Sequence, residues 1–220
     1  DRMTTAAPLI NYARKYRALD WYPIPCCWPT ASGECGCGAS PPHKGKDIGK
    51  APLLGTGWQQ LTPSMADVEA WWRRWPRANI AILLAPSGLI VVDPDSPEAI
   101  TEVEALGVPP TATCRTGKGE HHYFKRPEGV EARRKLKSGA SRSLDILGRG
   151  YVMAPPSLHA NGKTYTWTSP KGLQPQDPPQ WVLDALAPPP PAPAPASLPP
   201  LHKPSMRWTL DDEQRDWQLA

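Results

Sequence analysis

Three features are absent from this sequence of 220 residues, and each absence narrows the class of protein. No stretch of about 18 apolar residues occurs, so a membrane-spanning helix is not predicted. No charged start followed by a short apolar segment indicates a secretory signal, and we therefore expect a cytoplasmic protein. The pattern G-x-x-x-x-G-K-[ST] is also missing, which excludes a P-loop helicase motor within this sequence.

Composition separates a folded part from a proline-rich end. Apolar residues make up 40% of the chain and charged residues 21%, which is enough to bury the core of one domain. Residues 187–206 are rich in proline and alanine and predict a semi-rigid linker, whereas residues 207–220 are either a short helix or a disordered end. The folded domain is therefore predicted over residues 3–186. The net charge of the whole chain, +4, is compatible with a polyanionic partner without requiring one.

Hydrophobic periodicity predicts a mixed α+β fold. Turns at residues 86–88, 117–119 and 148–150 each separate two short apolar runs, so we expect three strand pairs that carry candidate site residues toward one cleft. Helices are predicted over residues 9–19, 97–106 and 179–186, and a further helix runs from an N-cap at Thr62 or Ser64 to residue 75. Strands are predicted over residues 79–85, 89–92, 111–116, 121–124, 144–147, 151–154 and 164–167.

Three aspartates are candidate metal ligands. Asp93 and Asp95 follow a buried strand, and their spacing of two turns both side chains to one face. Two acids this close suit a divalent cation such as Mg²⁺ or Mn²⁺, although a solvated Asp-Pro-Asp turn is the alternative. Asp145 lies between apolar residues of another predicted strand, where a cation, or a salt bridge to Arg142 or Arg149, would offset the cost of burying its charge.

Basic side chains surround these acids in the sequence. His121 leaves the turn at residues 117–119 and enters a strand, a geometry that presents an imidazole and backbone N–H groups to a phosphate, although many single histidines are structural. Cationic residues near the motifs would neutralise a triphosphate or grip a template, with a solvated surface as the alternative for each; they are Arg115, Lys118, Arg142 and Arg149.

Four of the five cysteines lie close together in a segment that has no periodicity. This segment, residues 26–52, has no core of its own, and a bound Zn²⁺ would order it. The alternative is free thiols on a loop, and Cys114 lies apart in a strand, where we expect it to be core. The predicted ligands are four of Cys26, Cys27, Cys35, Cys37 and His43, namely the last three with either Cys26 or Cys27.

Several blocks of sequence follow one another in a characteristic order. They are GW at 57–58, WWRRWPRANIAI at 71–82, SGLIVVDPD at 87–95, RTG at 115–117, HHYF at 121–124, LDI at 144–146 and GYVMAPPSLH at 150–159. Over residues 10–186 this order resembles the N-terminal domain of bifunctional DNA primase/polymerases, the prim-pol branch of the archaeo-eukaryotic primase superfamily.

The resemblance implies a fold and a site. The fold would be a primase-like catalytic core of two α/β subdomains, one similar to the RNA-recognition fold, with the active site in the cleft between them and a small zinc-binding element. Asp93, Asp95 and Asp145 would bind two metal ions, and His121 would contact the triphosphate of the incoming nucleotide. Relatives often have serine where this chain has Gly119, and a backbone N–H would have to replace that hydroxyl.

The implied function is that of a primase-polymerase. Such an enzyme transfers nucleotides from dNTPs or NTPs under the direction of a single-stranded DNA template, often in the replication of plasmids, phages or integrated elements. In relatives a helicase domain frequently follows, so a helicase or another replication partner is expected beyond the linker.

Two other functions compete with this interpretation. A catalytically idle module would hold single-stranded DNA through the zinc loop and some of the ten tryptophans, but it has no need of three acids. A replication-initiator nuclease needs two histidines on one face of a strand, and His121 and His122 are adjacent, which places them on opposite faces.

Overall fold

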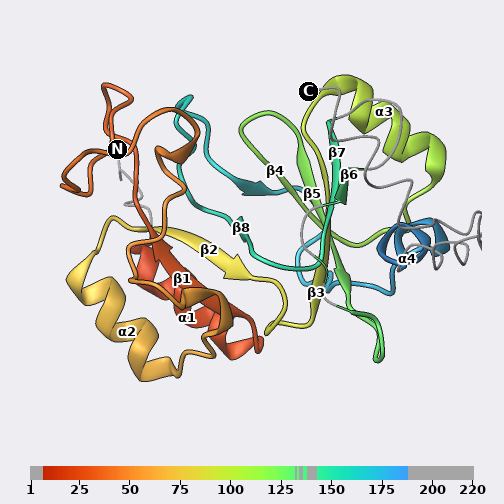
Figure 1. Ribbon diagram of the computed structural model, residues 1–220, viewed down its shortest axis with the longest axis horizontal. Helices are drawn as coiled ribbons and strands as arrows, with labels where there is room; N and C mark the ends of the chain where they lie inside the picture. The colour runs from red at the N-terminus through yellow and green to blue at the C-terminus, as the bar shows by residue number, and fades with distance from the viewer. Residues whose placement is uncertain (1–6, 132, 134–135, 138–142, 188–220) are drawn as a thin grey trace, which may run out of the picture. The chain divides into compact units, whose positions relative to one another are not determined.

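The computed structural model describes residues 7–131, 133, 136–137 and 143–187, all within the compact unit Asp1–Ala187. The predicted linker beyond residue 187, the segment 207–220 and Arg142 lie outside the described residues. The described chain has a mixed α+β fold with two antiparallel sheets (Figure 1). In this part of the chain, no helix has the length and apolar character needed to cross a membrane.

Two amphipathic helices pack against one face of the first sheet. α1 spans Leu9–Ala18 and α2 spans Met65–Arg74, both as predicted. Ser64 begins α2: its hydroxyl accepts the N–H of Asp67, and the Asp67 carboxylate accepts the N–H of Ser64. The buried side chains of both helices join those of the sheet in one hydrophobic cluster, which includes Ala13, Tyr16, Val68, Trp72, Ile80 and Ile82.

The first sheet has three strands in the order β1-β2-β8. The sequence pattern does not predict β1 (Tyr22–Cys26), because Pro23 and Pro25 interrupt it and lack the N–H that a ladder uses. Within its sheet β1 is an edge strand that pairs only with β2, so proline is tolerated there. β2 (Asn79–Leu83) and β8 (Tyr151–Met153) lie where strands are predicted.

The second sheet has six strands in the order β6-β7-β3-β5-β4-β9, and every neighbouring pair is antiparallel. All but β6 correspond to predicted strands. Their bounds are Leu89–Pro94 (β3), Ala112–Arg115 (β4), Glu120–Lys125 (β5), Leu136–Lys137 (β6), Leu144–Leu147 (β7) and Thr166–Trp167 (β9).

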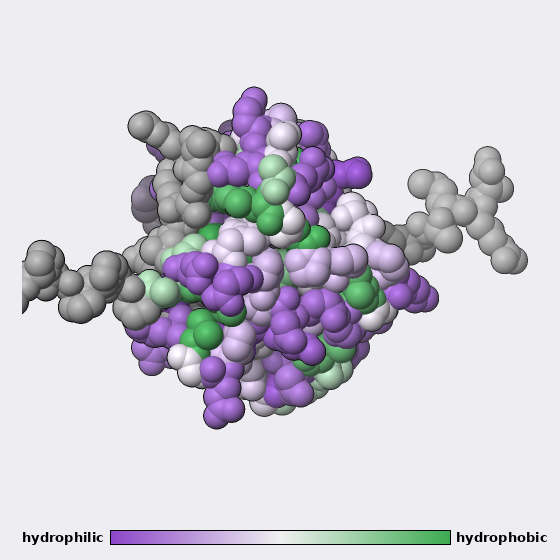
Figure 2. Space-filling view, turned by 90° about the vertical axis from the view of Figure 1, so that its right-hand side faces the viewer, coloured by the Kyte–Doolittle hydropathy of each residue, from purple (hydrophilic) through white to green (hydrophobic). Residues whose placement is uncertain are grey.

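The two faces of the six-stranded sheet have different coverings. On one face α3 (Pro97–Leu106) and α4 (Gln180–Leu186) pack on alternate residues of the strands, among them Ile90 and Phe124. On the other face, Val91 and its neighbours pack in the cluster that also holds α1 and the first sheet. Figure 2 shows the side that carries α3 and α4: hydrophilic residues cover most of it, and hydrophobic residues appear in small separate patches.

Two of the three predicted strand pairs are wrong. β4 pairs with β5 around the turn at residues 117–119, as expected. The strands that flank Gly88 lie in different sheets, and so do those that flank Gly148. β2 and β3 are buried along most of their length, so each needs a neighbouring strand on both sides. β2 lies between β1 and β8, and β3 lies between β7 and β5. The N–H of Leu84 donates to the carbonyl of Gly150 (3.0 Å), so the two crossings between the sheets lie side by side.

Candidate active site

Asp93 and Asp145 face each other across the ladder between β3 and β7. They are direct register partners, and side chains of such a pair project from the same face of the sheet. This is the face of Val91, not the one that α3 and α4 cover. Asp145 is only 3% exposed and the Asp93 side chain 14%. Two carboxylates held opposite each other repel, so this position favours a cation between them.

Asp95 lies just beyond the end of β3, at the same edge of the site. Its N–H donates to the carbonyl of Ser143, the residue before β7, over 2.9 Å. This bond fixes the exit of β3 against the entry of β7, while the Asp95 side chain is exposed. The structure therefore brings the third predicted acid to the same end of the ladder as Asp93 and Asp145.

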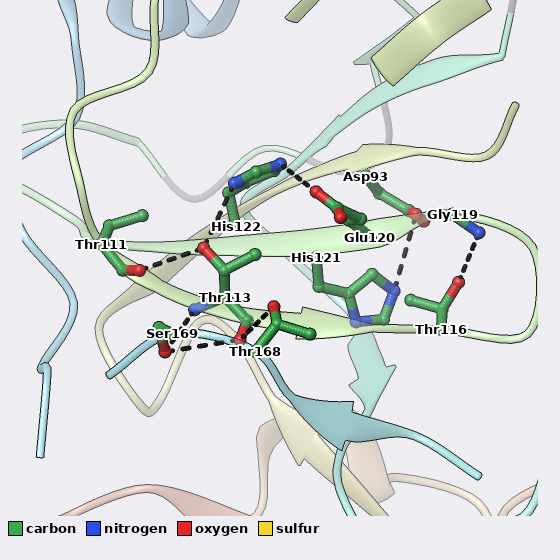
Figure 3. Close-up of polar contacts among 10 residues, drawn as sticks. All are labelled: Asp93, Thr111, Thr113, Thr116, Gly119, Glu120, His121, His122, Thr168 and Ser169. Atoms are coloured by element: carbon green, nitrogen blue, oxygen red, sulfur yellow. Dashed lines mark hydrogen bonds and ion pairs between the residues drawn. The ribbon is translucent and has the colours of Figure 1, made fainter. Parts of the chain in front are cut away.

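His121 reaches this face from β5, the other neighbour of β3. Its Nε2 lies 3.5 Å from Oδ1 of Asp93 (Figure 3). The pKa of His121 is lowered to about 3, mainly by burial, with smaller contributions from the charge of Lys50 and from the neighbouring His122. The imidazole is therefore neutral at pH 7, and its contact with Asp93 is not an ion pair. The predicted second motif thus meets the first in space.

The turn between β4 and β5 packs tightly against the exit of β3. A Cβ at Gly119 would overlap the carbonyl of Pro94, so only glycine fits and a serine there would displace the turn. The N–H groups of Gly119 and Lys118 donate to Oγ1 of Thr116, over 2.9 and 3.2 Å (Figure 3 shows the first). In this structure these two N–H groups therefore form hydrogen bonds within the turn, whereas the sequence indicated that backbone N–H groups here would contact a phosphate.

The predicted cations divide between different parts of the molecule. Lys118 lies exposed at the turn, close enough to His159 for its charge to lower that residue's pKa. Arg115 pairs with Glu120 on the ladder, and strand alternation places both on the face opposite His121. Arg149 is exposed in the turn after β7, at the end of that strand away from Asp145. The structure brings only Lys118 of these three to the acids.

Two further residues of the site were not assigned a role from the sequence. The charge of Lys50 lowers the pKa of both His121 and His159, which places it within electrostatic reach of both rings. The ring of Tyr165 lies between the two imidazoles, with centroids 6.0 Å from His121 and 6.1 Å from His159. His159 ends the last sequence block noted above and Lys50 lies in the cysteine-rich segment 26–52, but nothing in the local pattern shows that they meet.

His122 faces the other side of β5. Its Nδ1 lies 3.3 Å from Oγ1 of Thr113, and its Nε2 lies 3.3 Å from Oε2 of Glu120 (Figure 3). Burial lowers the pKa of His122 to about 4. These residues line a cavity of about 520 Å³ beside α3. The adjacency of His121 and His122 predicts that they lie on opposite faces of the strand, and the structure confirms this.

The cysteine-rich segment brings four of its five candidate ligands together. Sγ of Cys35 lies 3.2 Å from both Sγ of Cys37 and Nδ1 of His43. Cys27 completes the group, since its Sγ, that of Cys35 and a ring nitrogen of His43 all lie within 4.8 Å of one another. Cys26 instead is fully buried in the hydrophobic cluster of the first sheet, because alternation along β1 turns it the other way.

The chemistry of this group suits zinc. Burial alone would raise the pKa of Cys35, but hydrogen bonds from Cys37, from His43 and from Cys27 lower it to about 7. Burial raises the pKa of Cys27 to about 11. Three thiols and one imidazole are a common structural zinc set, and a metal would favour the thiolate forms. Cys114 is buried in the core, as expected.

A comparison with protein families identifies the family of this chain. The model of one family, described as bifunctional DNA primase/polymerase, N-terminal, matches residues 13–181. The matched region contains every acid, histidine and cysteine discussed above. A search of curated proteins found no match. The family match covers more than half of the chain, and the chain therefore belongs to the family of bifunctional DNA primase/polymerase N-terminal domains.

Proposed function

We propose that this chain is a primase-polymerase, a nucleotidyltransferase that joins dNTPs or NTPs under the direction of a single-stranded DNA template. Membership of the family implies primase or polymerase activity in DNA replication. The observation that carries the proposal is the register pair of Asp93 and Asp145, with Asp95 at the strand exit and His121 beside Asp93. A binding module has no use for three carboxylates gathered in this way.

The three carboxylates are the proposed ligands of two divalent cations, Mg²⁺ or Mn²⁺. Oxygen donors on one face, with two of them directly opposed, fit the preference of these ions. When bound, the pair would activate a 3′-hydroxyl and stabilise the leaving pyrophosphate during in-line attack on the α-phosphorus. Asp93 and Asp145, held by the β3–β7 ladder, would set the position of the reacting groups.

His121 is the proposed contact to the triphosphate. Its Nε2 lies 3.5 Å from Oδ1 of Asp93, and because a carboxylate only accepts, we assign the ring proton of the neutral imidazole to Nε2. A neutral imidazole with Nε2–H turned toward the acids donates to a phosphate oxygen without adding a charge to the site. Burial, which keeps the ring neutral, thus favours a donor role over an acid role.

We also propose that Cys27, Cys35, Cys37 and His43 hold a structural Zn²⁺. Cys27→Ala is expected to abolish zinc binding, whereas Cys26→Ala, one residue away but in the core, is expected to retain one zinc per chain. Mass spectrometry of protein purified without chelator measures both. Equal zinc content in the two variants would contradict this ligand set.

The finer fold assignment belongs to the proposal as well. The first sheet with α1 and α2, and the second sheet with α3 and α4, would be the two subdomains of an archaeo-eukaryotic primase core, the second being the one similar to the RNA-recognition fold. Their support is that each sheet has its own pair of helices, α1 and α2 on the first and α3 and α4 on the second, while one hydrophobic cluster joins the facing sides of the two sheets. A helicase domain or another replication partner beyond residue 187 is part of the same proposal.

The decisive experiment is synthesis on single-stranded DNA, with and without a primer, using labelled dNTPs or NTPs and Mn²⁺ or Mg²⁺. The control is Asp93→Ala combined with Asp95→Ala. Products formed without a primer and lost in the control would establish a primase, and extension only from a primer would establish a polymerase. Binding of DNA with no synthesis under any of these conditions would favour the idle DNA-binding module.

A further inference from the structure

The segment that follows β8 is fixed to the rest of the molecule at several points. The hydroxyl of Tyr16 donates to the carbonyl of Pro155 over 2.5 Å. The side-chain amide of Asn79 donates to the carbonyl of Leu158 and accepts its N–H, over 2.8 and 2.9 Å. The backbone immediately before His159 is therefore held by α1 and by β2, two elements distant in sequence.

His159 itself packs against the turn between β4 and β5. Its ring lies so close to Gly117 that a Cβ at that position would overlap the ring atoms. Asn161 joins the same two residues, because its side-chain amide donates to the carbonyl of Gly117 over 2.9 Å and its N–H donates to Nδ1 of His159 over 3.1 Å. The imidazole is thus placed beside the turn that carries Lys118 and leads into His121.

These contacts determine which nitrogen of His159 carries the proton. Nδ1 accepts a hydrogen bond, so in the neutral ring the proton belongs to Nε2. Within the part of the chain that the structure describes, Nε2 has no hydrogen-bond partner. Burial and the charges of Lys50 and Lys118 lower the pKa of His159, while Asp95 opposes this shift. The side chain therefore offers a neutral N–H donor at the edge of the site.

Lys50 approaches the same place from the end of the cysteine-rich segment. Its N–H donates to the carbonyl of Asp47 over 3.1 Å, and its own carbonyl accepts the hydroxyl of Tyr151 over 2.9 Å. The first bond closes a local turn, and the second attaches the backbone of Lys50 to β8, the strand that leads to His159. Its charge reaches both His121 and His159, as described above.

We propose that His159 and Lys50 bind the phosphate tail of the incoming nucleoside triphosphate. The inference rests on the proposed function and names two residues of its nucleotide site. Three acids at the end of the β3–β7 ladder attract cations. Beside them lie Lys118, in the turn whose Gly119 packs on Pro94, and the ring of His159, which packs on Gly117 of the same turn. Lys50 lies on the segment that is bonded to Tyr151 of β8. A polyphosphate, which carries several negative charges and accepts hydrogen bonds, is complementary to these lysines and to the N–H donor of His159.

The test compares a triphosphate with a monophosphate. We would measure equilibrium binding of a dNTP and of the matching dNMP, in the presence of Ca²⁺, to the wild type and to Lys50→Met and His159→Phe. The phenyl ring keeps the packing against Gly117 and removes both ring nitrogens, namely the Nε2–H donor and the Nδ1 that accepts the N–H of Asn161. Each variant is expected to bind the dNTP roughly tenfold more weakly and the dNMP unchanged, because a lost bond to a charged phosphate carries an effect of this order.

Matched controls separate this role from general effects. Lys163→Met removes an exposed lysine from the same segment, and His122→Gln removes a histidine from the opposite face of β5; both are expected to bind the dNTP like the wild type. Thermal melting confirms that each variant is folded, and Lys50→Arg is expected to restore most of the affinity.

Two outcomes would overturn the inference. Unchanged dNTP affinity in folded Lys50→Met and His159→Phe would show that neither residue meets the phosphates. Equal weakening of dNTP and dNMP would place them at the sugar, base or α-phosphate instead. Failure of the proposed function would give a different result. In that case the wild-type chain makes no product on any template, whatever the affinities of these variants for the dNTP.

Discussion

The two faces of the six-stranded sheet are built from the same strands and differ in what their polar groups contact. On one face, His121 lies beside Asp93, and Asp93 lies opposite Asp145. On the other face, His122 contacts Thr113 and Glu120 next to a cavity beside α3. Two adjacent residues of one strand therefore belong to two different environments, because successive side chains of a strand alternate between its faces.

Burial does not distinguish the two histidines. It lowers the pKa of His121 to about 3 and that of His122 to about 4, so both rings are neutral at pH 7. Their partners do distinguish them. Both nitrogens of His122 contact side chains that form no part of the proposed site, whereas Nε2 of His121 points at a proposed metal ligand. A strongly lowered histidine pKa therefore accompanies burial on either face of this sheet and does not by itself mark the proposed site.

The largest expected effect comes from replacing each histidine in turn. His121→Gln is expected to reduce nucleotide incorporation by about 100-fold or more, because it removes a donor aimed at the reacting phosphates. His122→Gln is expected to change the rate by less than about twofold, since its partners lie on the opposite face. Steady-state incorporation on a primed template measures both. Similar losses in the two variants would break the comparison between the faces.

The next largest effect concerns the turn that supports the site face. Gly119→Ala is expected to lower the free energy of unfolding by about 3 kcal/mol, because its Cβ would overlap the carbonyl of Pro94 and neither backbone segment can move freely. Gly55→Ala is the matched control: Gly55 is exposed with open space around its Cα, and the expected change is below about 0.5 kcal/mol. Urea unfolding gives both values, and equal stability of the two variants would contradict the packing argument.

The smallest effect is a pH dependence that originates on the α3 face. The folded state lowers the pKa of His122 from 6.5 to about 4, so the unfolded chain binds the proton more readily than the folded one. Stability from this residue is complete above pH 6.5 and is lost as the pH falls toward 4, by about 2 kcal/mol at pH 5. His122→Gln is expected to reduce the slope of the stability curve in this window by about half, because His121, whose pKa is lowered to about 3, contributes a similar slope. A curve that keeps its full slope in urea titrations would show that other groups cause it.

Much of the fold follows from the sequence, but the pairing of strands does not. Periodicity locates α1 to α4 and most strands, because an amphipathic pattern depends only on local residues. The turns at Gly88 and Gly148 resemble hairpin turns, yet each carries the chain from one sheet to the other. Which strand becomes a neighbour depends on burial against distant elements, and a single sequence does not contain that information. β1 is missed for a different reason, since its two prolines are typical of a loop.

Motifs in the sequence indicate some residues of the proposed site, whereas others come together only in the folded chain. Asp93, Asp145 and His121 meet as the resemblance implies. Arg115 is near His121 in the sequence but lies on the other face of the sheet, because successive side chains of a strand alternate between its two faces. Lys50 is 71 positions from His121, so only the folded chain shows that its charge reaches that ring.

The crossing of the chain between its two sheets has a consequence for how the molecule folds. The first sheet combines residues 22–26, 79–83 and 151–153, and the second takes its central strands from the stretches in between. No single cut separates the two sheets, and during synthesis neither is complete until Met153 has left the ribosome. Contacts so distant in sequence are closed late and slowly. We therefore expect the two sheets to unfold in one cooperative transition, with a folding rate set by the long-range pairing of β2 with β8.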